Sequence, residues 1–232
     1  MARTVLLTEA DSLLGAAIAR ILASKGFAIA AASAIPDRTA AGGAVTGSAP
    51  RPGGPAPCIA VKWNGRSPVS ARGVLLSALN AFDDIDEAII ISPPSPPAAE
   101  TVQIASADVE RGFDGCKGVV FLVREVLAHF LRRGAGVVSM VSYSALPDEN
   151  GPPLARAMRE CFRGFASSLL GSQPANGLIL NGFQALGVPP EEFAVFIDKT
   201  LEEKARKISG RWFTCQPRGG FLQNVLRTSA LR

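Results

Sequence analysis

The sequence contains few of the side chains that carry chemistry in most enzymes: its 232 residues include one histidine, one tyrosine and four cysteines. The cysteines (Cys58, Cys116, Cys161 and Cys215) are far apart in the chain and lack the spacing of a metal-binding motif. Three of them fall in apolar helix or strand patterns, where a cysteine behaves as a small hydrophobic residue. We therefore expect reduced cysteines, no metal centre and a cytoplasmic chain.

Long runs of one residue type are also missing. No apolar run reaches the roughly 18 residues of a membrane span, because Glu9 and Asp11 interrupt the apolar N-terminal segment. That segment also lacks the basic start of a signal peptide. The net charge is only +4, and the basic residues are scattered, with no run longer than Arg132-Arg133. The sequence thus predicts neither a membrane nor a nucleic acid as a partner.

The chain does show a rhythm of short apolar runs separated by longer helical patterns. The expected strands are Thr4–Thr8, Ala28–Ser33, Cys58–Trp63, Ala88–Ser92, Gly136–Ser142, Leu178–Phe183 and Arg211–Cys215. The expected helices are Leu13–Lys25, Val69–Phe82, Asp108–Arg132, Pro153–Gly171 and Pro190–Lys207. Because the strands are mostly continuous apolar runs, we predict an α/β fold: a Rossmann-like, doubly wound parallel sheet of about seven strands.

One connection breaks this rhythm, since residues 36–57 form a Gly/Pro/Ala-rich stretch without helical period. We interpret it as a flexible loop that replaces a crossover helix, although a simple loop insertion would give the same pattern. Residues 219–232 are expected to form a C-terminal tail. The whole chain, 1–232, is predicted to be a single domain.

Several segments, taken in order, resemble the short-chain dehydrogenase/reductase family over nearly the whole chain. They correspond, in order, to its first strand and helix, its long central helix, its catalytic-serine strand, the helix after the catalytic tyrosine, the strand that follows this helix, and its closing strand and loop. These segments are Val5-Leu6-Leu7-Thr8 with Gly15-Ala16-Ala17-Ile18-Ala19, Lys117-Gly118-Val119, Gly136–Ser142, Arg163-Gly164-Phe165 with Ser167-Ser168-Leu169, Asn181, and Ile208-Ser209-Gly210 through Gly219-Gly220.

The resemblance implies a dinucleotide site, and the sequence departs from the family there. The motif Thr-Gly-x-x-x-Gly-x-Gly maps onto residues 8–15, where Thr8 and Gly15 remain but Glu9 and Leu13 replace the other glycines. Those glycines let backbone N–H groups approach a pyrophosphate at the helix N-terminus. A carboxylate about 4 Å from a phosphate costs about 4 kcal/mol at an effective dielectric of ~20. The alternative is that the acidic residues only favour the helix N-terminus. We expect no bound cofactor.

Two further parts of the implied cofactor site are also altered. Only Asp37 and Arg38 remain as candidate ribose contacts after the second strand. The family's Asn-Asn-Ala-Gly segment is replaced by Ser92-Pro93-Pro94-Ser95-Pro96-Pro97, whose four prolines remove four backbone donors.

The resemblance also implies a catalytic Asn-Ser-Tyr-Lys tetrad, which here maps onto Gly115, Ser142, Ala155 and Arg159. Alanine cannot exchange a proton, and arginine is always charged, so we predict a solvated or ion-paired Arg159 and no catalytic residue. The sole tyrosine, Tyr143, should point away from Ser142, because adjacent strand residues face opposite sides. His129 has no partner evident in the sequence and is expected to be a helix C-terminal residue.

The two long helices keep more apolar surface than a single buried face needs. The first carries the stripe Val109, Phe113, Cys116, Val120, Val123, Leu127 and Phe130 beside a second stripe, Val119, Leu122 and Val126. The second carries Leu154, Met158, Cys161 and Phe165 beside Phe162, Ala166 and Leu169. Such breadth indicates burial on two sides, so Phe113, Val120, Val123 and Phe162 would face solvent in a monomer. A wide face buried inside one domain is the alternative.

In the family these helices pair with a neighbouring subunit. The resemblance therefore implies a non-catalytic pseudoenzyme subunit that assembles through helices 108–132 and 153–171 with a catalytically active short-chain dehydrogenase/reductase paralogue. The assembly would be a heterotetramer in an alcohol or hydroxyacyl-CoA dehydrogenase complex. Two alternatives remain open: an atypical NAD(P)-dependent oxidoreductase with a rearranged site, and a sensor that binds a metabolite.

Overall fold

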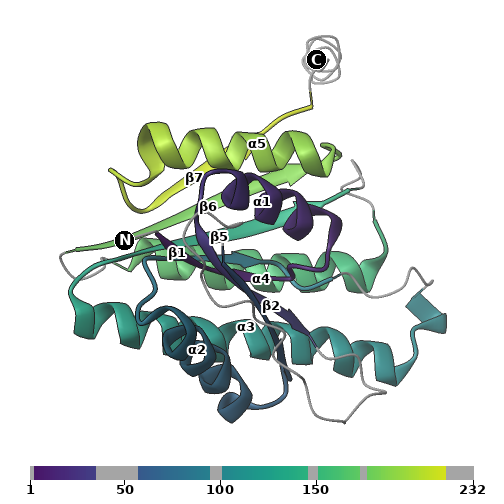
Figure 1. Ribbon diagram of the computed structural model, residues 1–232. Helices are drawn as coiled ribbons and strands as arrows, with labels where there is room; N and C mark the ends of the chain where they lie inside the picture. Colours follow the sequence, from purple (N-terminus) through teal and green to yellow (C-terminus); the bar gives the residue numbers. More distant parts are fainter. Residues whose placement is uncertain (1–2, 35–56, 95–100, 146–150, 173–176, 218–232) are drawn as a thin grey trace.

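The computed structural model describes residues 3–34, 57–94, 101–145, 151–172 and 177–217. Within these ranges helices alternate with seven strands (Figure 1). The strands are β1 (Thr4–Thr8), β2 (Ala28–Ala34), β3 (Cys58–Trp63), β4 (Glu87–Ile91), β5 (Gly136–Ser144), β6 (Leu178–Leu186) and β7 (Arg211–Cys215). The helices are α1 (Leu13–Ser24), α2 (Pro68–Phe82), η1 (Thr101–Gln103), α3 (Ser106–Arg133), α4 (Pro153–Gly171), α5 (Pro190–Thr200) and the π-helical turn η2 (Leu201–Ala205).

The seven strands form one sheet in the order β3-β2-β1-β4-β5-β6-β7, and all neighbours are parallel. Helices α1 and α5 cover one face, and α2, α3 and α4 cover the other (Figure 1). The prediction of a Rossmann-like, doubly wound parallel sheet is therefore confirmed. All strands end at one edge of the sheet, called here the carboxyl edge, and begin at the opposite amino edge. Ligands of open α/β sheets bind outside the carboxyl edge.

Burial on both faces explains the continuous apolar runs of the strands. Along β1, Leu6 packs in the core under α2, α3 and α4, whereas Val5 and Leu7 pack in the core under α1 and α5. Both sets of side chains are removed from water, so no polar face remains to produce alternation. This is why sequence patterns located the strands well, and β1, β3 and β7 have the predicted bounds.

The last helix differs from the prediction. We expected one helix from Pro190 to Lys207, but the α-helix ends at Thr200 and continues as a π-helical turn to Ala205. Asn181 of β6 is fully buried beneath this turn and donates hydrogen bonds from Nδ2 to the carbonyls of Ala205 and Ile208, both 2.7 Å long. A side chain on another element thus helps to hold this segment. The predicted loop 36–57, apart from Pro57, and the predicted tail lie outside the described residues.

The prediction for the outer face of α3 and α4 is partly wrong. Phe113 and Val120 are 51% and 40% exposed, but Val123 and Phe162 are only 1% and 2% exposed. Helix α3 is flanked by α2 on one side and α4 on the other, so more than one of its stripes packs inside the subunit. Packing within one chain therefore accounts for part of the wide apolar surface of these helices. Of the four residues predicted to face solvent, only Phe113 and Val120 are exposed. In the described ranges, no helix is long and apolar enough to cross a membrane.

Candidate functional site

The loop between β1 and α1 keeps a backbone turn that would suit glycine. Glu9 has a φ of 49°, and Ser12 N–H closes the turn by donating to the Glu9 carbonyl oxygen at 2.9 Å. A left-handed conformation is strained for residues that carry a Cβ. Thr8 lies just before it, and its Oγ1 accepts a 2.8 Å hydrogen bond from Ile91 N–H, which joins the ends of β1 and β4. Glu9 thus occupies a backbone position for which the family resemblance implies glycine.

Gly15, the remaining glycine of the motif, is required by the packing of the loop itself. A Cβ on Gly15 would lie 2.0 Å from the Glu9 carbonyl oxygen and 2.8 Å from Ala10 Cα. Helix α1 therefore rests directly on the loop backbone. Because the fold alone requires this glycine, its presence carries no information about a bound dinucleotide.

The N-terminus of α1 is capped from within the chain. Ser12 is the N-cap residue, and its Oγ accepts a 2.9 Å hydrogen bond from Gly15 N–H. That donor is one of the groups with which a helix N-terminus can bind an anion. Leu13, which we expected to crowd the site, is 76% exposed and belongs to neither core cluster. Within this loop Ser12 caps the helix and Glu9 is buried, while Leu13, the first residue of α1, stays exposed.

Glu9 is a buried carboxyl group at this edge, with only 7% of its surface exposed. Burial, and secondarily the nearby charge of Asp11, raises the pKa of Glu9 to about 7. A large part of the population is therefore uncharged at neutral pH, which weakens the expected charge repulsion of a phosphate by Glu9. What remains is the volume of the side chain and the charge of exposed Asp11.

The first residues after β4 fill the space beside α3. Ser92 N–H donates to the Val141 carbonyl oxygen at 2.8 Å, and Pro93 then packs against Gly115 of α3. A Cβ on Gly115 would lie 2.9 Å from Pro93 Cβ and 3.3 Å from its Cγ. An asparagine at Gly115, as the family tetrad implies, would therefore require Pro93 to shift. The other predicted departures at Asp37, Arg38, Pro96 and Pro97 lie outside the described residues.

The end of β3 also meets α3 closely. A Cβ on Gly118 would lie 2.7 Å from Gly65 Cα and 3.0 Å from the Trp63 ring, so helix and loop touch almost backbone to backbone. Trp63 is 3% exposed, and its Nε1–H has no hydrogen-bond partner in the described part of the chain. Asp114 joins the same contact through ion pairs with Lys117 and Arg66, which lower the pKa of its carboxyl group. The end of β3 and helix α3 are thus joined by close packing and ion pairs within the chain.

The remaining tetrad positions lie on β5 and α4. Ser142 is 3% exposed near the end of β5, and Ala155 lies half-buried in the first turn of α4. Arg159 follows one turn later on α4, beside Met158, whose sulfur is 3.9 Å from Cys116 Sγ on α3. Cys116 is in turn the neighbour of Gly115. The fold therefore brings the four predicted positions to the same end of the sheet, but only Ser142 has the residue type that the family implies.

Arg159 has the ion pair that was predicted, with Glu160 as its partner, but its side chain is largely buried. Its side chain is 13% exposed, and its nearest acidic partner, Glu160, lies 3.7 Å away. The Nε atom is buried without a hydrogen-bond partner among the described residues. An arginine stays charged, so burial of this group is unfavourable unless an anion or water satisfies it.

Tyr143 takes no part in this arrangement. Its hydroxyl donates a 2.9 Å hydrogen bond to the Val188 carbonyl oxygen, and its ring stacks on Phe193 with centroids 5.7 Å apart. Phe193 belongs to the core under α1 and α5, on the opposite face of the sheet from α3 and α4. The expected opposite orientation of Ser142 and Tyr143 is thus what the structure has.

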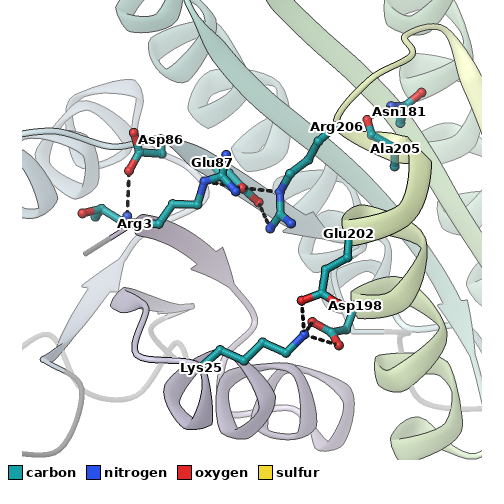
Figure 2. Close-up of polar contacts among 10 residues, drawn as sticks. Arg3, Lys25, Asp86, Glu87, Asn181, Asp198, Glu202, Ala205 and Arg206 are labelled. Atoms are coloured by element: carbon teal, nitrogen blue, oxygen red, sulfur yellow. Dashed lines mark hydrogen bonds and ion pairs between the residues drawn. The ribbon is translucent and has the colours of Figure 1, made fainter. Parts of the chain in front are cut away.

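The amino edge carries a dense set of ion pairs that sequence reasoning missed. Glu87, with a side chain 2% exposed, accepts from Arg3 at 3.0 Å and from Arg206 at 2.7 Å, and Figure 2 shows all three together. Nearby, Lys25 at the end of α1 contacts Asp198 at 2.7 Å and Glu202 at 2.5 Å (Figure 2). These groups stand at the starts of strands and the ends of helices.

His129 has a partner that we did not predict. Its Nε2 lies 3.0 Å from Asp84 Oδ1, and Arg133 contacts the same carboxylate at 2.8 Å and Asp86 at 2.7 Å. The sequence features that could have predicted this contact are the acidic pair just before β4 and the arginine at the end of α3. These segments meet because α3 leads into β5, the strand next to β4. No nucleophilic side chain takes part in these contacts, and they lie at the amino edge. We interpret this histidine as structural.

A metal site does not accompany the tetrad positions in the part of the chain that the structure describes. One small cavity of about 10 Å³ lies between α1 and α5, with a mainly apolar lining that includes Ile18, Leu22 and Leu201. That is about the room of one water molecule, and it is on the sheet face opposite α3 and α4. The same ranges hold no group of three or more histidine, cysteine or acidic residues that could bind a metal.

No protein-family model matches the sequence, and no curated protein is significantly similar to it. Solved structures with the same fold are found. A 3-ketoacyl-ACP reductase from Sinorhizobium meliloti 1021 is 16% identical with a TM-score of 0.73, over 94% of this chain and 99% of that chain. A short-chain dehydrogenase/reductase family oxidoreductase from Burkholderia thailandensis is 18% identical with a TM-score of 0.73, over 99% and 97%.

A short-chain dehydrogenase/reductase from Serratia marcescens BCRC 10948 is similar to the same degree: 17% identity and a TM-score of 0.71, over 94% of this chain and 97% of that chain. At these identities the likeness concerns the fold. The chain therefore has the fold of short-chain dehydrogenases/reductases over nearly its whole length.

Proposed function

We propose that this protein is a non-catalytic member of the short-chain dehydrogenase/reductase family that assembles with a catalytically active paralogue. The observation that carries the proposal is the state of the carboxyl edge. The chain places Glu9 in the glycine turn, Pro93 against the position of the tetrad asparagine, and Ala155 at the position of the proton donor. A proton donor of this kind typically contributes about 10²–10⁴-fold to a rate.

The outer face of α3 supports the assembly part of the proposal. Phe113 and Val120 lie two turns apart on one stripe and are 51% and 40% exposed. A single large apolar residue in solvent is common, but two on one stripe beside a second helix suit an interface. Burial of each such side chain contributes roughly 1.5–3 kcal/mol. We infer that the partner packs here, on α3 and α4.

Gly164 on α4 supports the same face. It is exposed in the middle of a helix, and no atom lies within 4 Å of where its Cβ would stand. A glycine in a helix interior costs about 1 kcal/mol relative to alanine, and nothing in the described part of the chain requires it. Close approach of a partner helix would account for it.

Heteromeric dehydrogenases that pair an active with an inactive short-chain subunit give the proposal a concrete form. One is the 2-(hydroxy(phenyl)methyl)-succinyl-CoA dehydrogenase of anaerobic toluene degradation, and the loss pattern here is similar to that of its inactive subunit. By this analogy the protein would be one half of a cytoplasmic heterotetramer that oxidises an alcohol or a hydroxyacyl-CoA. The partner would supply the cofactor and the catalytic residues.

Co-expression with a short-chain dehydrogenase encoded beside this gene tests the assembly. Light scattering should show a complex, which Val120→Glu dissociates while the subunit stays folded by circular dichroism. Val195→Glu is the matched control, because Val195 is 42% exposed on α5 at the opposite face. A well-behaved wild-type monomer that ignores the neighbour would contradict the proposal, and so would equal effects of the two substitutions.

A second candidate function has one observation in its favour. Arg159, whose largely buried Nε has Glu160 at 3.7 Å but makes no hydrogen bond among the described residues, would suit the carboxylate or phosphate of a metabolite, as in a sensor. Thermal shift with a set of acyl-CoA esters and dicarboxylates would detect such binding. Arg159→Met should abolish a real shift, whereas Arg156→Met, at an exposed position on the same helix, should not. If no compound shifts the wild type, this candidate is excluded for those ligand classes.

A further inference from the structure

Two cysteines that are distant in the sequence meet between α3 and α4. Cys116 Sγ lies 3.8 Å from the Met158 carbonyl oxygen and 3.9 Å from Met158 Sδ. Cys161 follows Met158 by one helical turn, so Cys116 lies against the turn of α4 that carries Cys161. The wide separation of the four cysteines in the sequence led us to expect no pairing, and the packing of α3 on α4 removes that separation for two of them.

The two thiols differ in their access to solvent. Cys161 is exposed, whereas Cys116 is buried with 8% of its surface accessible. Burial, together with the neighbouring Cys161 thiol, raises the pKa of Cys116 to about 12. A reagent from solution therefore reaches Cys161 first, and Cys116 is held beside it as the second thiol. The pair has the arrangement of an attacking and a resolving cysteine.

We propose that Cys116 and Cys161 are a dithiol modification site, which a low-molecular-weight disulfide oxidises to an intrachain disulfide linking α3 to α4. The Cys161 thiolate attacks one sulfur of the reagent, forming a mixed disulfide and releasing one thiol. Cys116 then loses its proton and attacks Cys161 Sγ, which forms the intrachain bond and releases the second thiol. Two protein thiols are oxidised, and one reagent disulfide is reduced to two thiols.

Geometry favours closure of this bond over any other pairing. Cys116 Sγ already touches the turn of α4 that carries Cys161, and rotation of the two side chains has to bring the sulfurs to about 2.05 Å. Cys58 and Cys215 stand on β3 and β7, the outermost strands on opposite sides of the sheet. They can pair with each other only if the fold is lost. The inference is independent of the proposed partner.

Incubation of the reduced, full-length protein with oxidised glutathione tests the proposal. Intact mass should fall by the two hydrogen atoms of one disulfide, and digestion without reductant should yield one peptide pair joining Cys116 to Cys161. Cys58→Ser, the matched control at another exposed cysteine, should give the same crosslink. Cys116→Ser should instead stop at a glutathione adduct on Cys161.

Three outcomes would overturn the proposal. One is a wild-type chain that keeps glutathione on Cys161 without closing the bond. Another is a disulfide that involves Cys58 or Cys215, and a third is a chain that stays fully reduced under conditions that oxidise a small-molecule dithiol. Circular dichroism of each variant before oxidation shows whether it is folded, and Cys116→Ala replaces Cys116→Ser if the serine is not tolerated.

Discussion

The two edges of the sheet have opposite characters. At the amino edge, polar groups are paired: buried Glu87 binds Arg3 and Arg206, and Asn181 bonds the carbonyls of Ala205 and Ile208. At the carboxyl edge, Glu9 is buried with no side-chain hydrogen bond among the described residues, and the largely buried Arg159 has only its 3.7 Å contact with Glu160. In open α/β sheets, ligands bind outside the carboxyl ends of the strands.

This difference suggests which selection still acts on the chain. The amino edge needs only to hold helices and strands together, and that requirement is independent of catalysis. The carboxyl edge differs from the pattern that the family resemblance implies, yet close packing around Gly15 and Gly118 holds its loops and helices together. We infer that the fold is maintained as a scaffold.

The largest effect is expected when the amino edge is broken. Glu87→Gln leaves Arg206, with a side chain 16% exposed, without its counter-charge. Loss of one member of a buried ion pair costs about 3–5 kcal/mol, which urea denaturation would measure. Ser142→Ala at the carboxyl edge should cost less than about 1.5 kcal/mol, the value of one ordinary hydrogen bond. Equal losses of unfolding free energy in the two variants would contradict the proposed difference between the two edges.

A pH-dependent effect of similar size is expected at the carboxyl edge. Here the ionised carboxylate of Glu9 destabilises the folded state, whereas that of Glu87 stabilises it. The pKa of Glu9 is raised from 4.5 to about 7 in the folded state. As pH rises from 4.5 to 7, the unfolded chain loses this proton before the folded chain does, so the folded state becomes less stable. Relative to Glu9→Gln, the wild type should lose about 3 kcal/mol over this window.

Stability curves of both proteins at pH 4.5, 6 and 7.5 measure this difference. Asp11→Asn sharpens the test, because Asp11 contributes to the raised pKa and its removal should shrink the effect. A Glu9→Gln variant whose stability runs parallel to the wild type at all three pH values would show that the carboxyl group is not held in the buried position.

A smaller effect, at Gly164, should distinguish the stability of the isolated subunit from its binding to the partner. Gly164→Ala should stabilise the isolated subunit by about 1 kcal/mol, because its Cβ enters open space within a helix. The same change should weaken the complex with the partner. Gly73→Ala on α2 has the same open surroundings and should stabilise the subunit without affecting assembly. If Gly164→Ala leaves the complex unchanged, the partner does not approach α4 closely.

The smallest effect is expected from restoring the proton donor. Ala155→Tyr returns a tyrosine to the tetrad position but leaves Glu9, Pro93 and Arg159 unchanged. Turnover of model ketones or alcohols with either nicotinamide cofactor should stay at background, as a spectrophotometric assay of the reduced nicotinamide would show. Measurable turnover by this single variant would mean that the carboxyl edge still binds a cofactor.

The sequence predicted the sheet well, because strands buried on both faces appear as continuous apolar runs such as those of β1 and β4. The assignment of the tetrad positions rests on order and spacing along the chain and stays a prediction. The sequence did not predict the burial of Val123 and Phe162, the pairing of His129 with Asp84, or the contact of Cys116 with the turn of α4 that carries Cys161. Each of these depends on how two elements pack in space, and local periodicity carries no record of that.

The central claim is that the carboxyl edge no longer binds a dinucleotide, and calorimetric titration of the purified chain tests it most directly. With NAD+, NADH, NADP+ and NADPH in turn, we predict no binding with a Kd below about 100 μM, which corresponds to about −5.5 kcal/mol. An active short-chain dehydrogenase, titrated in parallel, verifies the reagents. A Kd below that value for any of the four nucleotides would contradict the account.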